Sequence, residues 1–266
     1  MKRFFCYFTV LFFILSSSVA FGLNCNKIKK DELLSQLPNN PFIKAFFSRA
    51  KILNKRKVKG LCEVVLDLNG RFYPCYVGKD FLLMGQMYSN GQLVSKPVIE
   101  RLKAKKEQKD KKLFLSKKSE LDKLAAIVYT PSKKAKRVLY MFTDPLCPFC
   151  HKMESKIKEI VDKYNVTLKV MLYSVHPPKG PKKAIEAVCK KFTLDKYLSE
   201  NWRKEKDEEV NKYQCKQGKQ LIEKTSKIAR ELGVRGVPTF IMDDGTRVVG
   251  ARINELEKLL KKETTK

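Results

Sequence analysis

Residues 138–152 of this 266-residue chain have the sequence VLYMFTDPLCPFCHK. The continuous apolar run from Val138 to Phe142 predicts a strand that is buried on both faces of a sheet. After a turn, a helix is expected to begin near Cys147, because apolar residues then recur at intervals of three and four. These residues are Cys150, Met153, Ile157, Ile160, Val161 and Tyr164. The stretch therefore predicts a buried strand that leads directly into an amphipathic helix.

The segment Cys147-Pro148-Phe149-Cys150 lies at this junction and has the residues needed for redox chemistry. Thiol–disulfide exchange requires a thiolate, and the unpaired N–H groups and dipole of a helix N-terminus stabilise one. We therefore expect Cys147 to be the nucleophile and Cys150 to be the resolving thiol that releases a mixed disulfide. His151 is a candidate for stabilising the Cys147 thiolate as an imidazolium, and the alternative is a partly exposed polar residue.

Two other kinds of site use the same spacing. Zinc sites contain Cys-x-x-Cys pairs, and Cys189 with Cys215 would complete a set of four ligands. With His151 included, the segment also matches the pattern for covalent haem attachment. The surroundings favour thiol–disulfide exchange, because a buried strand runs into the segment and Val237-Pro238-Thr239 follows downstream. We therefore predict neither a metal nor a cofactor.

Two polar residues near the segment are expected to be structural. Asp144 precedes the cysteines, and we favour a turn-forming role for it over proton relay. His176 stands before Pro177-Pro178 in a predicted loop.

The rest of residues 113–266 completes an α/β domain. The hydrophobic pattern predicts a strand over 166–175, helices over 181–192 and 216–232, a hairpin formed by 238–242 and 246–249, and a final helix from about residue 253. The order is β-α-β, a helical insertion and then β-β-α, which resembles the thioredoxin arrangement.

Residues 21–96 are predicted to form a separate small α+β domain. Asn69-Gly70 between apolar runs is a strong hairpin signal. Residues 97–112 are rich in lysine and in good helix formers and have few apolar residues, so we expect a solvated helical linker. In the predicted hairpin Cys62 and Cys75 lie diagonally unless a bulge shifts the register, and a Cys62–Cys75 disulfide is the pairing that we favour. Cys25 is an alternative partner for either, or could pair across a dimer.

Residues 1–20 predict a signal peptide. Lys2 and Arg3 precede an apolar run to Leu15, and small residues up to Ala20 then provide a cleavage site. The chain has 56 Lys and Arg against 28 Asp and Glu, a formal charge of +28. These charges are spread along the chain and no nucleic-acid motif accompanies them, so we expect a lysine-rich surface and no nucleic-acid partner. The signal peptide predicts that the protein is exported.

The sequence resembles the periplasmic thiol:disulfide interchange proteins of the DsbC/DsbG family. The similarity includes residues 142–152 around the two cysteines, residues 61–87 of the small domain, and Cys189 and Cys215 in the insertion. The resemblance implies a homodimer formed through residues 21–96, and a membrane reductase of the DsbD type that keeps the active cysteines reduced. It also implies a structural Cys189–Cys215 disulfide.

In the thioredoxin fold the bond before Pro238 is cis and faces the active cysteines. The backbone of Val237 is then expected to pair with an extended substrate, and Thr239 to shape the groove. The family usually has Thr at position 237, and Val237 and Pro148 are closer to the oxidase DsbA. We expect an isomerase or reductase of wrong disulfides in secreted or unfolded periplasmic proteins. The alternatives are a dithiol oxidase and a thiol-independent holdase chaperone.

Overall fold

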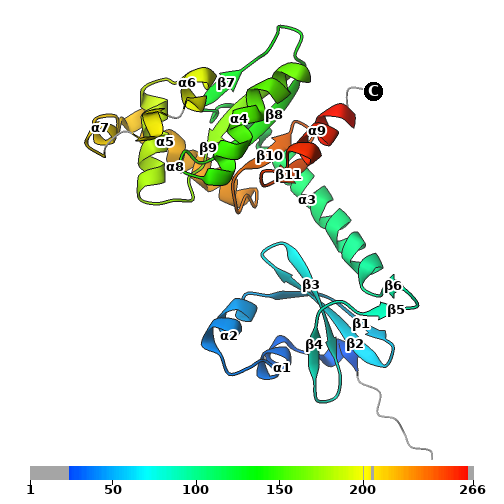
Figure 1. Cartoon of the computed structure of the whole chain (residues 1–266). Helices are drawn as coiled ribbons and strands as arrows, with labels where there is room; N and C mark the ends of the chain where they lie inside the picture. The colour runs from blue at the N-terminus through cyan, green and yellow to red at the C-terminus, as the bar shows by residue number, and fades with distance from the viewer. Residues whose placement is uncertain (1–23, 200, 205–206, 263–266) are drawn as a thin grey trace, which may run out of the picture. The chain divides into compact units, whose positions relative to one another are not determined.

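The computed structural model describes residues 24–199, 201–204 and 207–262 (Figure 1). The predicted signal peptide, residues 1–20, lies outside this range. The chain divides into two compact units between Lys103 and Ala104, and each is described by itself. Among the residues that the structure describes, no helix combines the length and the apolar composition needed to cross a membrane.

The N-terminal unit contains an antiparallel sheet with the strand order β1-β2-β3-β4. Its elements are η1 (Cys25–Lys27), α1 (Lys30–Ser35), α2 (Pro41–Ser48), β1 (Lys51–Val58), β2 (Leu61–Leu68), β3 (Arg71–Val77), β4 (Leu82–Met84), β5 (Tyr88–Ser89) and β6 (Gln92–Leu93). Asn69 and Gly70 form the predicted turn between β2 and β3, with φ angles of 56° and 82°. Both residue types tolerate positive φ, so the turn follows the right-handed twist of the strands.

The predicted Cys62–Cys75 disulfide is wrong. The β2–β3 register places Cys62 opposite Val77 and Cys75 opposite Val64, so the two cysteines are diagonal neighbours with no bulge to align them. Instead η1 brings Cys25 to within 5.2 Å of Cys62 between Cα atoms, and these two form the disulfide. Cys75 stays a buried thiol in the same apolar core.

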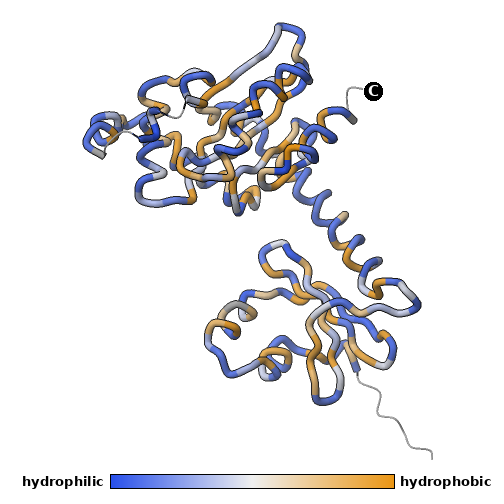
Figure 2. The backbone as a smooth tube through the Cα atoms, viewed as in Figure 1, coloured by the Kyte–Doolittle hydropathy of each residue, from blue (hydrophilic) through white to orange (hydrophobic). Residues whose placement is uncertain are grey.

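The predicted linker helix is longer than its sequence pattern indicated. Helix α3 (Lys96–Asp122) continues past Lys112. Its C-terminal part is held by packing, because Phe114 and Leu121 are fully buried and the Phe114 ring meets Tyr140 edge-on at 5.3 Å between centroids. Figure 2 shows that hydrophilic residues predominate along most of α3.

The C-terminal unit is built on a sheet with the strand order β11-β10-β8-β9-β7. Strands β8 and β9 are parallel, and the other neighbours are antiparallel. The elements are β7 (Ile127–Tyr129), β8 (Arg137–Thr143), α4 (Pro148–Lys163), β9 (Val166–Leu172), α5 (Lys179–Cys189), α6 (Leu194–Leu198), η2 (Asn201–Lys204), α7 (Asp207–Lys212), α8 (Lys216–Glu231), β10 (Thr239–Met242), β11 (Arg247–Val249) and α9 (Ile253–Lys262).

Strand β8 is buried on both faces, as its apolar run predicted. Leu139 and Met141 belong to a core shared with α4 and α9, whereas Tyr140 and Phe142 belong to a second core shared with α3 and α8. Helices thus cover both faces of the sheet. The insertion between β9 and β10 contains α5 to α8, and a disulfide joins Cys189 at the end of α5 to Cys215 at the N-cap of α8. This is the predicted thioredoxin-like domain with a helical insertion, after a small α+β domain and a long helix.

Candidate active site

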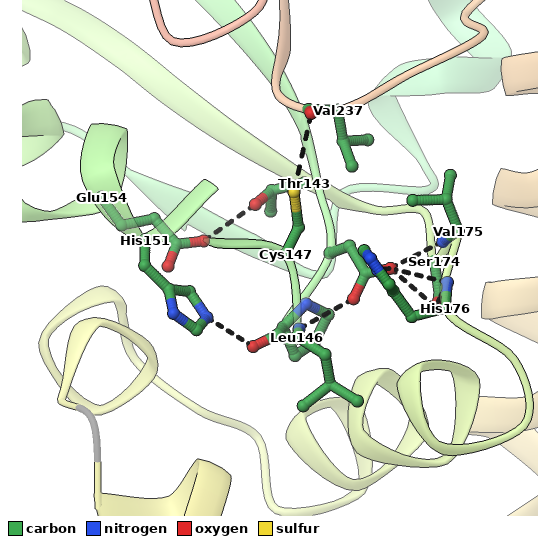
Figure 3. A network of polar contacts seen from close by, with 11 residues as sticks. Thr143, Leu146, Cys147, His151, Glu154, Ser174, Val175, His176 and Val237 are labelled. Atoms are coloured by element: carbon green, nitrogen blue, oxygen red, sulfur yellow. Dashed lines mark hydrogen bonds and ion pairs between the residues drawn. The ribbon is translucent and has the colours of Figure 1, made fainter. Parts of the chain in front are cut away.

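Cys147 occupies the N-cap of α4, directly after the turn that follows β8. Its N–H donates to the Asp144 carbonyl at 3.1 Å, and its own carbonyl accepts from the N–H groups of Cys150 and His151. Pro148 takes the first helical position, where a missing N–H has little cost. The sulfur of Cys147 is therefore fixed at the positive end of an amphipathic helix, and Figure 3 shows its surroundings.

The two cysteines of the segment differ in environment. Cys150 is completely buried, and Cys147 retains 4% of its surface. Burial raises the pKa of the Cys150 thiol strongly, and the neighbouring Cys147 adds to this effect. The Thr143 hydroxyl and the Asp144 backbone act in the opposite direction, because they favour the Cys150 thiolate. Phe149 between the cysteines is 66% exposed. An incoming substrate therefore reaches Cys147 before it reaches Cys150.

The loop before β10 meets Cys147 from the other side. The Val237–Pro238 peptide bond is cis, as the thioredoxin resemblance implied. The Cys147 thiol donates a hydrogen bond to the Val237 carbonyl at 3.7 Å (Figure 3). Thr239 is buried, and its hydroxyl donates to the Gly236 carbonyl at 2.7 Å, so its side chain braces this loop.

The ring of His151 is directed to the backbone of the preceding turn. Its Nε2 atom lies 2.7 Å from the Pro145 carbonyl oxygen, so Nε2 carries the proton and donates (Figure 3). That hydrogen bond fixes the turn before the cysteines. Nε2 is therefore engaged by the backbone of the turn, and a role of His151 in stabilising the Cys147 thiolate stays a prediction.

The side chains of Asp144 and His176 contact each other, which the sequence did not predict. The buried Asp144 carboxylate accepts from the Leu146 N–H at 2.8 Å, from the Val175 N–H at 2.6 Å and from His176 Nδ1 at 2.9 Å. The Ser174 hydroxyl also donates to it. Asp144 thus ties the turn before the cysteines to the loop between β9 and α5, in keeping with the structural role expected of it.

A buried polar cluster close to Cys150 was not predicted from the sequence. The Thr143 hydroxyl donates to Glu154 Oε1 at 2.8 Å, and Arg203 Nη2 donates to Glu154 Oε2 at 2.7 Å. Tyr197 of α6 lies against the same groups. One signal was present: Glu154 sits on the apolar face of α4, where a charged residue needs a buried partner.

The sulfur atoms in this unit are not arranged for zinc. Cys189 and Cys215 are bonded to each other, so they cannot supply thiolates to a site with Cys147 and Cys150. Over the described ranges, no group of three or more His, Cys, Asp or Glu side chains is placed to hold a metal ion.

Comparisons with known proteins agree with this geometry. The family described as "Thioredoxin-like domain" matches residues 124–264. Among solved structures, a linker-deletion mutant of Proteus mirabilis ScsC is 20% identical, with a TM-score of 0.53 over 64% of this chain and 88% of that one. The thiol-disulfide exchange protein alpha-DsbA2 from Wolbachia pipientis is 18% identical, with a TM-score of 0.51 over 59% and 97%.

A third structure, Helicobacter pylori DsbG, is 20% identical and covers 73% of this chain and 93% of its own, but its TM-score is 0.35. A comparison with curated protein sequences finds no significant match. At these identities the structural similarities establish the fold alone.

Proposed function

We propose that this chain, which belongs to the thioredoxin-like domain family, is a thiol–disulfide oxidoreductase that reduces or isomerises incorrect disulfide bonds in secreted proteins. The observation that carries the proposal is the position of Cys147, at the N-cap of α4 and beside the carbonyl of Val237. A helix N-terminus stabilises a thiolate there, and the adjacent backbone offers a place for an extended substrate.

The reaction begins with the Cys147 thiolate attacking one sulfur of a mispaired disulfide. The substrate S–S bond breaks, the other substrate sulfur leaves with the electron pair, and a Cys147–substrate disulfide forms. A substrate thiolate then attacks this mixed disulfide, which gives net isomerisation and regenerates Cys147. Alternatively Cys150 attacks it, which oxidises the Cys147/Cys150 pair by two electrons and releases reduced substrate.

Substrate recognition is assigned to the groups around Cys147. The loop before β10 brings the backbone of Val237 next to Cys147, where a substrate chain would lie, and Thr239 braces the loop from within. Phe149 offers an exposed ring beside the attacking sulfur. An extended segment with apolar side chains, as in an unfolded protein, fits this surface.

We assign the protein to the periplasm. The disulfides Cys25–Cys62 and Cys189–Cys215 suit an oxidising compartment, since such bonds are rare in the cytosol. The predicted signal peptide at residues 1–20 supports the same assignment. In that compartment the proposed partners are misoxidised or unfolded secreted proteins, a DsbD-type membrane reductase and a second copy of this chain bound through the N-terminal unit.

The second candidate is a dithiol oxidase. Val237 and Pro148 favour it, because both residues flank the reacting sulfur and are closer to the DsbA pattern. For a two-electron couple about 30 mV changes the equilibrium tenfold, so small local differences decide the direction of transfer.

One experiment separates the two candidates. The reduced protein is added to a scrambled disulfide-bonded test enzyme, and the oxidised protein is added to the same enzyme in reduced form. Regain of activity from the scrambled form, lost in Cys147→Ser, supports the isomerase. Rapid oxidation of the reduced form without rescue of the scrambled form supports the oxidase.

A further inference from the structure

We propose that Glu154, held by Arg203 of the helical insertion, accepts the proton of Cys150 through the hydroxyl of Thr143 when Cys150 resolves a mixed disulfide. The inference rests on the proposed function, because it concerns the second half of that reaction. Thr143 is the relay and Glu154 is the final proton acceptor, while Arg203 is a positioning residue that acts through Glu154.

The structure places the Thr143 hydroxyl next to both the Cys150 thiol and the Glu154 carboxylate. Thr143 is the last residue of β8, and its hydroxyl is both a neighbour of the Cys150 sulfur and a donor to Glu154 Oε1 at 2.8 Å. Glu154 stands one helical turn after Cys150 on α4, so both side chains project from the same face. Figure 3 shows the Glu154 carboxylate directed at Thr143.

The insertion supplies the opposite charge. Arg203 Nη2 lies 2.7 Å from Glu154 Oε2 and 2.9 Å from the Tyr197 carbonyl oxygen. The side chains of Arg203 and Glu154 are 6% and 2% exposed, so the ion pair is shielded from water. A buried carboxylate without a cation would take up a proton and lose its capacity to accept one. Arg203 therefore keeps Glu154 available as an acceptor.

The charged and titratable groups that face Glu154 come from each element packed on it. They are His151 of α4, Tyr197 of α6 and Arg203 of η2, with the Thr143 hydroxyl from β8. Burial raises the pKa of Glu154, and Arg203, Thr143, His151 and Tyr197 oppose that rise. Tyr197 is fully buried, and burial beside Glu154 raises its pKa well above the ordinary value. Tyr197 therefore stays neutral and does not compete for the proton.

The proton transfer balances with the disulfide chemistry. The Cys150 proton passes to Thr143 Oγ1 while the Thr143 proton passes to Glu154, which becomes a neutral acid. The Cys150 thiolate attacks Cys147, the Cys147–Cys150 bond forms, and the substrate sulfur leaves with the electron pair of the broken bond. Thr143 now donates to Cys150 and accepts from Glu154, so the relay has reversed its direction.

The test separates the two halves of the reaction in time. The reduced protein is mixed with excess 5,5′-dithiobis(2-nitrobenzoate), and release of the coloured thiolate is followed from pH 6 to 10. The first release reports attack by Cys147, and the second reports attack by Cys150 on the mixed disulfide. The second phase must be absent in Cys150→Ala, which identifies it.

We expect Glu154→Gln to leave the first phase unchanged and to slow the second on the order of a hundredfold at pH 7. The rate should recover as pH rises, because the thiol then ionises without the relay. Arg203→Met should give the same pH-dependent loss, and Arg203→Lys should restore part of it. Glu159→Gln, on the exposed side of α4, and Arg252→Met are the matched controls.

The outcomes distinguish this inference from the proposed function. An unchanged or faster second phase in Glu154→Gln overturns the proton-acceptor role, as does slowing by the same factor at every pH. If Arg203→Met fails to fold, the Glu154→Gln profile decides alone, because the amide keeps the side-chain shape. If the first phase is absent from the unmodified protein or unaffected by Cys147→Ser, it is the proposed function that fails.

Discussion

The thiol of Cys147 lies 3.7 Å from the carbonyl oxygen of Val237, although the two residues are 90 positions apart in the sequence. The contact joins the N-terminus of α4 to the loop before β10, and the antiparallel pairing of β8 with β10 holds the two together. A substrate sulfur bonded to Cys147 would leave its chain beside Val237. The two halves of the candidate site are thus positioned by the sheet.

The three thiols should differ widely in reactivity. Cys147 lies at a helix N-terminus, whereas Cys150 and Cys75 are fully buried, and burial raises the pKa of Cys75 to about 12. Brief treatment of the native reduced protein with iodoacetamide at pH 7 should therefore modify Cys147 first. Peptide mapping by mass spectrometry checks this. Modification of Cys75 at the same rate as Cys147 would contradict the description of the N-terminal core.

Loss of the Cys25–Cys62 disulfide should destabilise the N-terminal unit. The bond spans 37 residues, and the chain-entropy model gives about 2–4 kcal/mol for a loop of this size. We expect Cys25→Ser to lower the free energy of unfolding by this amount in urea. Cys75→Ser is the matched control, because it removes a thiol that takes no part in a disulfide. An equal loss in both variants would point to packing and not to the crosslink.

Removal of the Asp144 carboxylate should loosen the turn before the cysteines. Asp144→Ala leaves the part-buried N–H groups of Leu146 and Val175 without their acceptor, at a cost of about 1–3 kcal/mol. His176→Ala removes a half-exposed donor and should cost about 1 kcal/mol or less. Urea unfolding measures both. The assigned role of Asp144 would be wrong if the two variants were equally stable.

Asp122 at the end of α3 should contribute to stability in a pH-dependent way. Burial would raise its pKa, but hydrogen bonds from Lys169, Tyr140 and Lys118 outweigh burial and lower it to about 2. A carboxyl group with a lowered folded-state pKa stabilises the fold above its unfolded pKa near 3.9, and that contribution is lost as pH falls from about 4 to 2.

Because the Asp122 side chain is about one-third exposed, we expect a contribution of about 1–2 kcal/mol at neutral pH. Urea unfolding at pH 7 and at pH 2 should show a difference between the unmodified protein and Asp122→Asn that shrinks at the lower pH. A constant difference across this window would rule out a stabilising ionised Asp122.

Local sequence patterns predicted the strand and the helix that carry the cysteine pair, β8 and α4. The apolar run of β8 and the three-and-four spacing of α4 depend on neighbouring residues, so both elements could be predicted from the sequence. Strand β1 was not predicted, because it is an edge strand rich in Lys and Arg with exposed and half-buried positions. Its stability comes from partners elsewhere, such as the ion pair between Arg56 and the buried Glu63 of β2.

The candidate site was likewise predictable only where local motifs mark its residues. The cysteine pair and Val237-Pro238 carry motifs, and their roles could be proposed from spacing. The Glu154–Arg203 pair spans 49 residues and depends on how the insertion folds back onto α4, which no local pattern encodes. The Cys25–Cys62 pairing was named only as an alternative for a similar reason, since the choice depends on where η1 meets β2.

The most direct test of the central claim is to identify the sulfur that bonds to substrate. Cys150→Ala protein, recovered from the periplasm with its thiols blocked, should carry substrate proteins in mixed disulfides on non-reducing gels, and peptide mapping should place each bond on Cys147. The adducts should disappear when Cys147→Ser is added to Cys150→Ala. Adducts on Cys75, or none on any cysteine, would contradict the assignment of Cys147 as the attacking thiolate.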